Sequence, residues 1–302
     1  MNKHTNSFRQ LALIGSTASG KTALSIKLAT HLNAYILSLD SLSIYNEIDI
    51  VSAKPSIEER GDIRHFGIDV VNPDENFDVT TFIKLYQDVH AHCLNDGKNL
   101  VIVGGTSFYL KMLMDGISEL PPISENTKHL TTEHLHNVEQ AYDFLYTLDE
   151  AYMCNIEPTD TYRIGKALNI YFETSLVPTV YFEEHPPRAT ITEPLPVYQI
   201  VWEREVLRER IALRTQMMVN SGLIDEICLL EKKYGRAPNC MKSIGIKETL
   251  AYLDGVYDKK MLIEKITTNT ARLAKRQTTF NNSQFENVIK GSVEALEGLL
   301  LK

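Results

Sequence analysis

A glycine-rich loop lies near the start of the chain, between an apolar segment and a segment with helical periodicity. Residues 15–22 read Gly-Ser-Thr-Ala-Ser-Gly-Lys-Thr and match the phosphate-binding pattern G-x-x-x-x-G-K-[ST] without exception. The apolar segment Leu11–Ile14 has the length of a buried strand, and leucines spaced four apart predict a helix over residues 21–32. A loop of this kind between a strand and a helix is typical of P-loop α/β folds.

The next segments repeat this alternation of strand and helix. Residues 35–39 and 100–103 are short apolar runs that predict buried strands, and residues 82–94 have the spacing of an amphipathic helix. Strands separated by helices form parallel sheets covered on both faces. We therefore expect an α/β fold with a P-loop NTPase-like parallel sheet flanked by helices.

The composition changes after Gly116. Residues 124–175 are polar, acidic and mostly helical in pattern, and five prolines between Pro178 and Pro196 indicate an extended connection. Residues 196–202 resemble a strand that returns to the sheet, and residues from 203 to about 280 are helical in pattern. We expect a P-loop catalytic core with C-terminal helices, residues 1–118 and 196–302, and a mostly helical insertion domain, residues 119–195.

Composition and charge limit the classes of function. Hydrophobic residues make up 43% of the 302 residues, enough for a sizeable core without disulfides, and the four cysteines form no C-x-x-C pair. Met1–Gln10 is polar, and no apolar run approaches the length of a membrane span, so we expect a cytoplasmic protein without membrane contact. We also expect a monomer. The net charge of −8 disfavours a nucleic-acid partner, but residues 242–276 hold eight basic and four acidic residues.

The loop predicts a polyphosphate ligand. Its glycines let backbone N–H groups turn toward an anion at the positive end of a helix. Lys21 can neutralise the outer phosphate, and the hydroxyl of Thr22 can bind Mg²⁺, which we expect as the cofactor. The loop does not specify the chemistry, because it recognises the polyphosphate alone.

The residues that follow two of the predicted strands limit the reactions that the site can carry out. The strand 100–103 is followed by Gly104, Gly105 and Thr106 instead of the acidic residue of an ATPase. Asp40 follows the neighbouring strand, and the carboxyl ends of parallel strands share one edge of a sheet. Asp40 is therefore a candidate general base; the alternatives are a helix N-cap or an indirect role around Mg²⁺.

Taken in order along the chain, several segments resemble the motifs of the tRNA dimethylallyltransferase (tRNA isopentenyltransferase) family. The resemblance covers roughly residues 11–280, and no single motif is as specific as the series. The segments are Gly15–Thr22, similar to G-P-T-A-S-G-K-T; Asp40–Tyr45, similar to D-S-x-Q-x-Y; Asp49–Pro55, similar to D-I-G-T-A-K-P; Val103–Tyr109, similar to V-G-G-T-G-L-Y; and Ser221–Glu226, Ile244–Glu248 and Ala274–Gln277.

The resemblance implies an enzyme that transfers a dimethylallyl group from dimethylallyl diphosphate to the exocyclic amine of adenosine 37, beside the anticodon of tRNA. It implies that Asp40 takes the proton from that amine, that Thr106 assists at the adenosine or the bridging oxygen, and that Lys21 stabilises the leaving group. The implied diphosphate-binding residues are Gly15, Thr17, Ala18, Ser19, Gly20, Lys21, Thr22 and Arg163. The implied residues for the tRNA anticodon stem-loop are Asp40, Ser41, Leu42, Ser43, Lys128, Tyr162, Arg163, Lys166, Lys242, Lys247, Lys275, Arg276, Gln277 and Phe280.

Some positions depart from the family pattern. Ser43 stands for a glutamine, and Val51-Ser52 stands for Gly-Thr. Lys128 and Lys166 stand for arginines, and lysine lacks the bidentate fork. The segment 280–282, Phe-Asn-Asn, replaces W-F-R, which removes a phosphate contact and leaves Phe280 to stack on a base. These changes affect the grip on tRNA more than the chemistry.

Other clusters have ordinary interpretations. Arginines at helical spacing, Arg204 to Arg214, are interleaved with glutamates and favour a solvated, ion-paired face. Trp202 is expected in the core. The three histidines His129, His134 and His136 match no metal-binding spacing.

Two other functions share part of this pattern. A small-molecule or nucleotide P-loop kinase would use Asp40 to position a hydroxyl acceptor, but does not account for Gly104-Gly105-Thr106 or for the Lys-Arg-Gln segment that ends at Gln277. A nucleotide-dependent RNA-binding switch would need a hydrolysis site, and the sequence shows no Walker B acid. Protection by dimethylallyl diphosphate or by ATP distinguishes the first two functions.

Overall fold

A parallel sheet of six strands forms the centre of the larger of two compact units in the computed structural model, which describes residues 8–256 and 258–302. The strand order is β3-β2-β4-β1-β5-β6, and each neighbouring pair is parallel. The expected fold class is confirmed. The strands are β1 (Gln10–Gly15), β2 (Ala34–Leu39), β3 (His65–Phe66), β4 (Asn99–Gly104), β5 (Val197–Ile200) and β6 (Ile289–Gly291).

The contacts along the chain separate Met1–Met112 with Ile191–Lys302 from a second unit, Leu113–Thr190. The insertion limits expected from sequence, 119–195, stay a prediction. The polar segment Met1–Gln10 lies mostly outside the described residues. No helix within the described part of the chain is long and apolar enough to cross a membrane.

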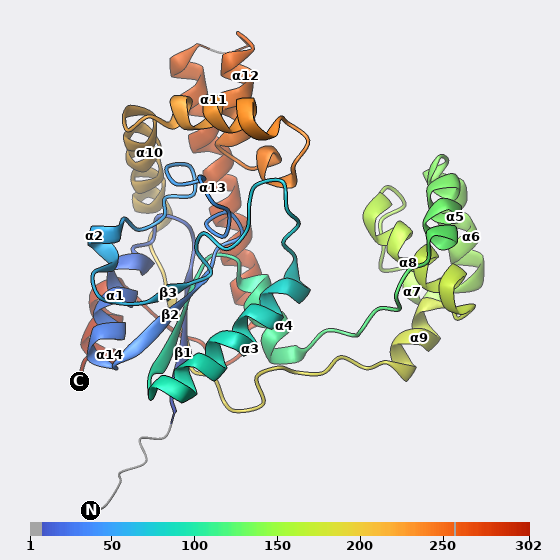
Figure 1. The fold of residues 1–302 in the computed structure, drawn as a ribbon, viewed down its shortest axis with the longest axis horizontal. Coiled ribbons are helices and arrows are strands. Elements are labelled where there is room, and N and C mark those ends of the chain that lie inside the picture. The colour runs from blue at the N-terminus through green and yellow to red at the C-terminus, as the bar shows by residue number, and fades with distance from the viewer. Residues whose placement is uncertain (1–7, 257) are drawn as a thin grey trace, which may run out of the picture. The chain divides into compact units, whose positions relative to one another are not determined.

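Helices cover both faces of the sheet (Figure 1). On one face, α1 (Lys21–His31) and α14 (Val293–Leu300) pack with the strands in a single core cluster that includes Leu24, Leu28 and Leu296. On the other face, α3 (Val79–Asp96) packs against β2 and β4, and its buried residues include Phe82. Burial on both faces explains why β1 and β4 are continuous apolar runs.

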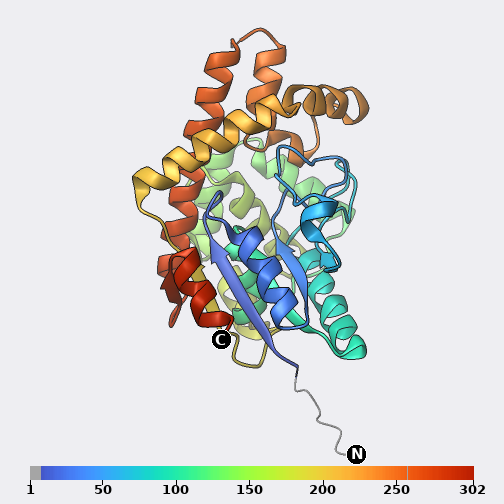
Figure 2. The same ribbon diagram turned by 90° about the vertical axis from the view of Figure 1, so that its left-hand side faces the viewer.

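A helical layer lies beyond the carboxyl ends of the strands (Figures 1 and 2). Residues of this layer and of the loop after β2 share one core cluster, which includes Ile48, Leu223 and Ile266. This cluster positions the loop 41–54 above the P-loop edge of the sheet. The helices are α10 (Arg204–Asn220), α11 (Leu223–Tyr234), the 3₁₀ helix η1 (Asn239–Lys242), α12 (Ile246–Leu253) and α13 (Lys259–Gln284).

The second unit is helical. Its core contains Leu145, Ile164 and Leu168. Its helices are α5 (Glu125–Leu135), α6 (Val138–Leu148), α7 (Glu150–Met153), α8 (Thr161–Thr174) and α9 (Pro178–Glu184); α4 (Ser107–Asp115) spans the boundary between the units, and α2 (Ile57–Arg60) completes the first unit.

Candidate active site

The phosphate-binding loop is bent around the ammonium group of Lys21. Nζ donates to the carbonyl oxygens of Gly15 at 3.0 Å and Ser16 at 2.6 Å. Ala18 and Gly20 have φ values of 62° and 94°, in the left-handed region. Turns of this type direct backbone N–H groups into an anion-binding concavity. The loop lies between β1 and α1, as the motif predicted, and its binding of phosphate stays a prediction.

Two side chains from the segment after β5 hold the same loop. Nε1 of Trp202 donates to the carbonyl of Ser19 at 2.9 Å, and Nε of Arg210 donates to the carbonyl of Ala18 at 2.8 Å. The guanidinium of Arg210 also lies 4.6 Å from the centroid of the Trp202 ring. Trp202 packs against the sheet core, as expected. Arg210 is exposed, as expected for a solvated face, and it also contacts the loop because β5 pairs with β1 and delivers α10 beside it. The expectation is wrong for Arg214, which is partly buried and lines the cleft described below.

Arg214 adds a second cation one helical turn later. Its Nη1 donates to Oγ1 of Thr17 at 3.4 Å. Burial, with the nearby charge of Arg214, lowers the pKa of Lys21 to about 7, and Asp40 opposes that shift. Burial also lowers the pKa of Arg214, again opposed by Asp40. Mutually repelling, desolvated cations of this kind are stabilised by a bound polyanion.

Asp40 lies directly after β2. Its Oδ1 accepts hydrogen bonds from the backbone N–H groups of Leu42 at 2.8 Å and Ser43 at 3.1 Å, so the carboxylate caps this turn. The same residue lines a cleft that Thr17 and Thr106 also line. Capping and contact with the cleft are therefore compatible, and the role as a base stays a prediction.

In the Gly-Gly-Thr turn after β4, Gly104 is packed too closely against the backbone of β2 for a larger residue, and Gly105 lies against the side-chain amide of Gln277. A β-carbon on Gly104 would lie 2.4 Å from the carbonyl oxygen of Leu39, and one on Gly105 would lie 2.6 Å from Nε2 of Gln277. Oγ1 of Thr106 accepts a hydrogen bond from the backbone of Ser41 at 3.2 Å. The turn thus brings the ends of β2 and β4 together at the cleft.

Gln277 joins this turn to the phosphate-binding loop. Its Oε1 accepts from the backbone N–H of Thr17, and its Nε2 donates to the carbonyl of Gly105, both at 3.0 Å. Sequence reasoning assigned Gln277 to tRNA. In the structure, the amide oxygen and the amide nitrogen of Gln277 both bond the protein backbone beside the phosphate-binding loop, and its contact with tRNA stays a prediction.

The cleft has a volume of about 290 Å³ and two chemically different sides. Its polar side is formed by the ends of β2 and β4, by the phosphate-binding loop and by α10. Its apolar side belongs to the core cluster shared by the loop 41–54 and the C-terminal helices. The polar lining includes Thr17, Asp40, Thr106, Arg214 and Gln277, and the apolar lining includes Leu42, Val51, Met218, Leu223 and Ile266.

The other residues of the first unit that were predicted to contact tRNA differ in exposure. Ser41 and Leu42 line the cleft, whereas Ser43 is buried with its hydroxyl 3.2 Å from that of Ser38. Phe280 is half-buried, edge-on to Phe285. The exposed cations, whose contact with tRNA stays a prediction, are Lys242, Lys247, Lys275 and Arg276.

The predicted residues of the second unit are exposed on α5 and α8. Lys128 pairs with Glu125, and Arg163 lies 3.4 Å from Asp160. Nζ of Lys166 lies 5.6 Å from the centroid of the Tyr162 ring. Their roles toward the diphosphate or tRNA stay predictions.

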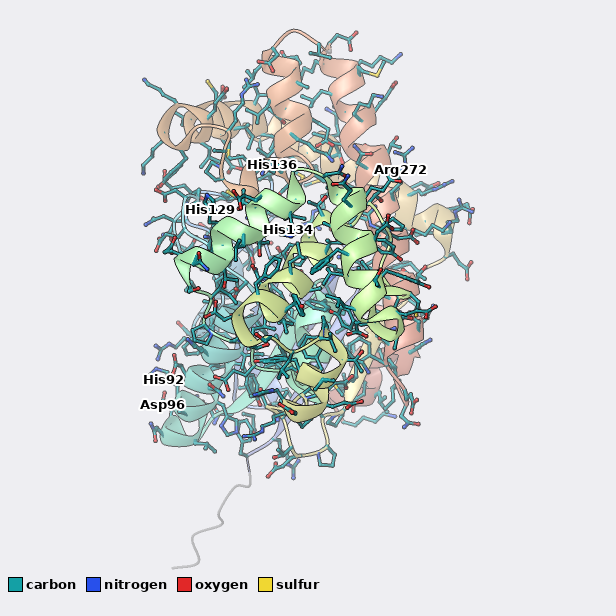
Figure 3. The ribbon with its side chains drawn as sticks, turned by 90° about the vertical axis from the view of Figure 1, so that its right-hand side faces the viewer. His92, Asp96, His129, His134, His136 and Arg272 are labelled. Carbon is teal, nitrogen blue, oxygen red and sulfur yellow. The ribbon has the colours of Figure 1, made fainter. Side chains whose placement is uncertain are left out.

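The histidines of α5 and its C-terminal cap are labelled in Figure 3. His129 lies 3.6 Å from Glu133, and the ring of His134 packs against Phe172 at 4.8 Å. Among the residues that the structure describes, no group of three His, Cys, Asp or Glu side chains is placed to hold a metal ion. A Mg²⁺ ion bound through substrate phosphates needs few protein ligands, and the exposed Thr22 at the start of α1 suits that mode.

Comparisons with known proteins agree with this geometry. The family model described as IPP transferase matches residues 43–284. A tRNA dimethylallyltransferase of Sulfurovum sp. is 68% identical over 97% of this chain and 98% of its own length, and one of Helicobacter pylori strain J99 is 41% identical over 97% and 93%. The full-length tRNA isopentenylpyrophosphate transferase of Bacillus halodurans has a similar structure, with a TM-score of 0.69, 28% identity, and coverage of 97% of this chain and 95% of that one. This chain belongs to the tRNA dimethylallyltransferase family.

Proposed function

We propose that this chain transfers the dimethylallyl group of dimethylallyl diphosphate to the exocyclic amine of adenosine 37 of tRNA and releases diphosphate. The family supports tRNA prenylation over the alternative of a P-loop kinase. The single observation that carries the proposal is the two-sided cleft, in which a P-loop lies next to an apolar wall.

The diphosphate occupies the polar side of the cleft. Backbone donors of the loop, the ammonium of Lys21 and the guanidinium of Arg214 surround the position of the phosphates. The short apolar chain of the donor lies along the apolar wall, where burial of hydrocarbon is favourable. A nucleotide donor would place a polar ribose and base against the same wall.

The reaction breaks the bond between the allylic carbon and the diphosphate oxygen, and the oxygen keeps the electron pair. The lone pair of the adenosine amine forms the new carbon–nitrogen bond. The amine then loses a proton to the carboxylate of Asp40. Lys21 and Arg214 stabilise the charge that grows on the leaving group, which is the main electrostatic contribution of the site.

A divalent cation, which we take to be Mg²⁺, fits this arrangement. The hydroxyl of Thr22 at the start of α1 would hold it, together with oxygens of the diphosphate. When bound it neutralises charge on the leaving group.

The acceptor is the anticodon stem-loop of a tRNA. The target base has to be turned out of the loop to reach an enclosed cleft. The exposed cations Lys242, Lys247, Lys275 and Arg276 and, from the second unit, Lys128, Arg163 and Lys166 supply phosphate contacts in this proposal. We place the protein in the cytoplasm, where tRNA is modified, and as a monomer.

A transfer assay tests the proposal. Protein, Mg²⁺ and labelled dimethylallyl diphosphate are mixed with unmodified tRNA, and Asp40→Asn serves as the variant because its amide oxygen can still accept from Leu42 and Ser43. We expect label at adenosine 37 with the unchanged protein and loss of transfer, with tRNA binding retained, in the variant. Label from ATP on a small acceptor, with none on any tRNA, would refute the proposal in favour of a kinase.

A further inference from the structure

Gly20 is the residue at which the phosphate-binding loop becomes a helix. It is the N-cap of α1, with φ of 94°, and as a glycine it has no side chain that could cap the first turn. The backbone N–H groups at the start of a helix lack partners within the helix and bind anions well. The orientation of the Gly20 backbone therefore affects where the first N–H groups of α1 point.

The backbone of Gly20 is in close contact with the C-terminal helix α14. Side-chain hydrogen bonds hold the backbone of the preceding residues 17–19. At Gly20 the contact is steric: a β-carbon there would lie 3.3 Å from Cγ2 of Val293 and 3.7 Å from Nη2 of Arg210. Val293 belongs to the first turn of α14, so this helix packs against the loop at the residue where α1 begins.

The sheet and the core fix α14 in this position. The strand β6 precedes it and pairs with β5, and the N–H of Val201 donates to the carbonyl of Gly291 at 3.0 Å. The hydroxyl of Ser292 caps the first turn of the helix. Leu296 is 1% exposed in the core cluster shared with α1, beside which α14 lies (Figure 1). The first turn of α14, with Val293, is therefore held against the loop.

Two neighbouring strands thus support adjacent residues of the loop. β5 and β6 are paired at their last residues, and Trp202 and Val293 each follow two residues later. Trp202 donates to the carbonyl of Ser19 at 2.9 Å, and Val293 packs against Gly20. The second support lies after the last family motif, which ends at Gln277, so no motif assigns it a role.

We propose that Val293 is a positioning residue of the donor site, which keeps Gly20 and the first N–H groups of α1 in the orientation that binds the diphosphate. This inference rests on the proposed function, because it takes the loop to be the diphosphate site. Val293 acts through the backbone of Gly20 and touches neither the donor nor the reacting atoms. The donor site then extends to the C-terminal helix of the chain.

Binding of diphosphate alone tests this role. Inorganic diphosphate with Mg²⁺ is titrated into the full chain by calorimetry, without tRNA. Val293→Ala removes two methyl groups from the contact with Gly20, and the dissociation constant should rise by about fivefold, the effect of one weakened hydrogen bond. Val293→Ser makes the same steric change and replaces the alanine variant if that variant does not fold. Val293→Thr keeps the branched shape at this half-buried position and should bind as the unchanged protein does.

Leu300→Ala is the matched control for packing of α14. Leu300 packs against the same core cluster from the last turn of the helix, about 10 Å along the helix from Val293. We expect this variant to lower the temperature of thermal unfolding at least as much as Val293→Ala does, and to leave the dissociation constant unchanged. A purely structural role of α14 would instead affect diphosphate binding in both variants alike.

The outcomes separate this inference from the proposed function. Equal dissociation constants for a folded Val293→Ala protein and the unchanged protein would overturn the inference, and so would an equal rise in Leu300→Ala. Diphosphate binding that Val293→Ala weakens, without transfer to tRNA by the unchanged protein, would support the inference and refute the proposed function. An unchanged protein that binds no diphosphate would overturn both.

Discussion

Lys21 makes donor binding depend on pH in a direction that the structure specifies. Its pKa in the free protein is about 7, lowered by burial and by the charge of Arg214. A bound diphosphate favours the charged ammonium, so binding takes up a proton wherever Lys21 is neutral beforehand. Affinity is therefore expected to fall about tenfold for each pH unit above 7, until the pKa of the bound state is reached.

The contribution of Lys21 to the stability of the fold changes with pH in the opposite direction. The folded pKa of Lys21 lies below its ordinary value of 10.5, so the unfolded chain holds the proton to higher pH. Between about pH 7 and pH 10.5 the unfolded state binds more protons, and the contribution of this group to stability rises with pH. Above pH 7, the affinity for the donor therefore falls with rising pH, whereas the contribution of Lys21 to the stability of the fold rises.

Calorimetry in two buffers of different ionisation enthalpy measures the proton uptake. At pH 8 about nine-tenths of Lys21 is neutral, so uptake of about 0.9 proton per donor is expected. A phosphate ester loses its last proton at about pH 6, so the donor contributes little. Lys21→Arg keeps the charge and does not titrate, and it should abolish the uptake. Equal uptake in Lys21→Arg and the unchanged protein would refute the assignment.

Three further changes test the supports of the cleft. Gln277→Ala removes hydrogen bonds to Thr17 and Gly105, and should raise the KM for the donor while lowering the free energy of unfolding by about 2 kcal/mol in denaturant titration; an unchanged KM would mean that the bridge does not shape the donor site. Glu248→Gln weakens the buried carboxylate that accepts from the backbone N–H of Gly245 at the start of α12, and is expected to lower stability by about 1–3 kcal/mol, as checked by urea unfolding. Lys54→Met removes a buried ammonium that donates to the carbonyl of Tyr45 and to the exposed carboxylates of Asp49 and Asp69, and should cost about 2 kcal/mol in the same measurement; no loss would show that the loop 41–54 is held by the carboxylate of Glu226 on α11, which accepts from the backbone N–H groups of residues 49–51.

Local patterns predicted the parts of the fold that depend on local interactions. The loop 15–22 could be recognised from its own glycines and the adjoining strand and helix, and continuous apolar runs indicated β1, β2 and β4. The short strand β6 was missed, because it has three residues, two of them exposed, and pairs with β5, about ninety residues earlier in the chain. It contacts α14, which also contacts β5, and contacts of this kind are not encoded in the periodicity of the sequence.

The same distinction applies to the site. Asp40 and Thr106 could be placed at one edge, because parallel strands end on the same side of a sheet. Arg210 and Arg214 looked like members of a solvated face, since arginines interleaved with glutamates at helical spacing are common there. The available signal was Trp202: an indole at the end of a strand that returns to the sheet marks the following helix as packed.

The polar end of the cleft is therefore assembled from the most distant parts of the chain. Trp202, Arg210 and Gln277 hold the backbone of residues 17–19, across sequence separations of 183 to 260 residues. A loop supported in this way reaches its anion-binding shape only when β5 has joined β1 and α13 has packed above them. The electrostatic site thus depends on completion of the whole first unit, and a fragment ending before residue 196 would keep the motif and lose these three supports for the donor site.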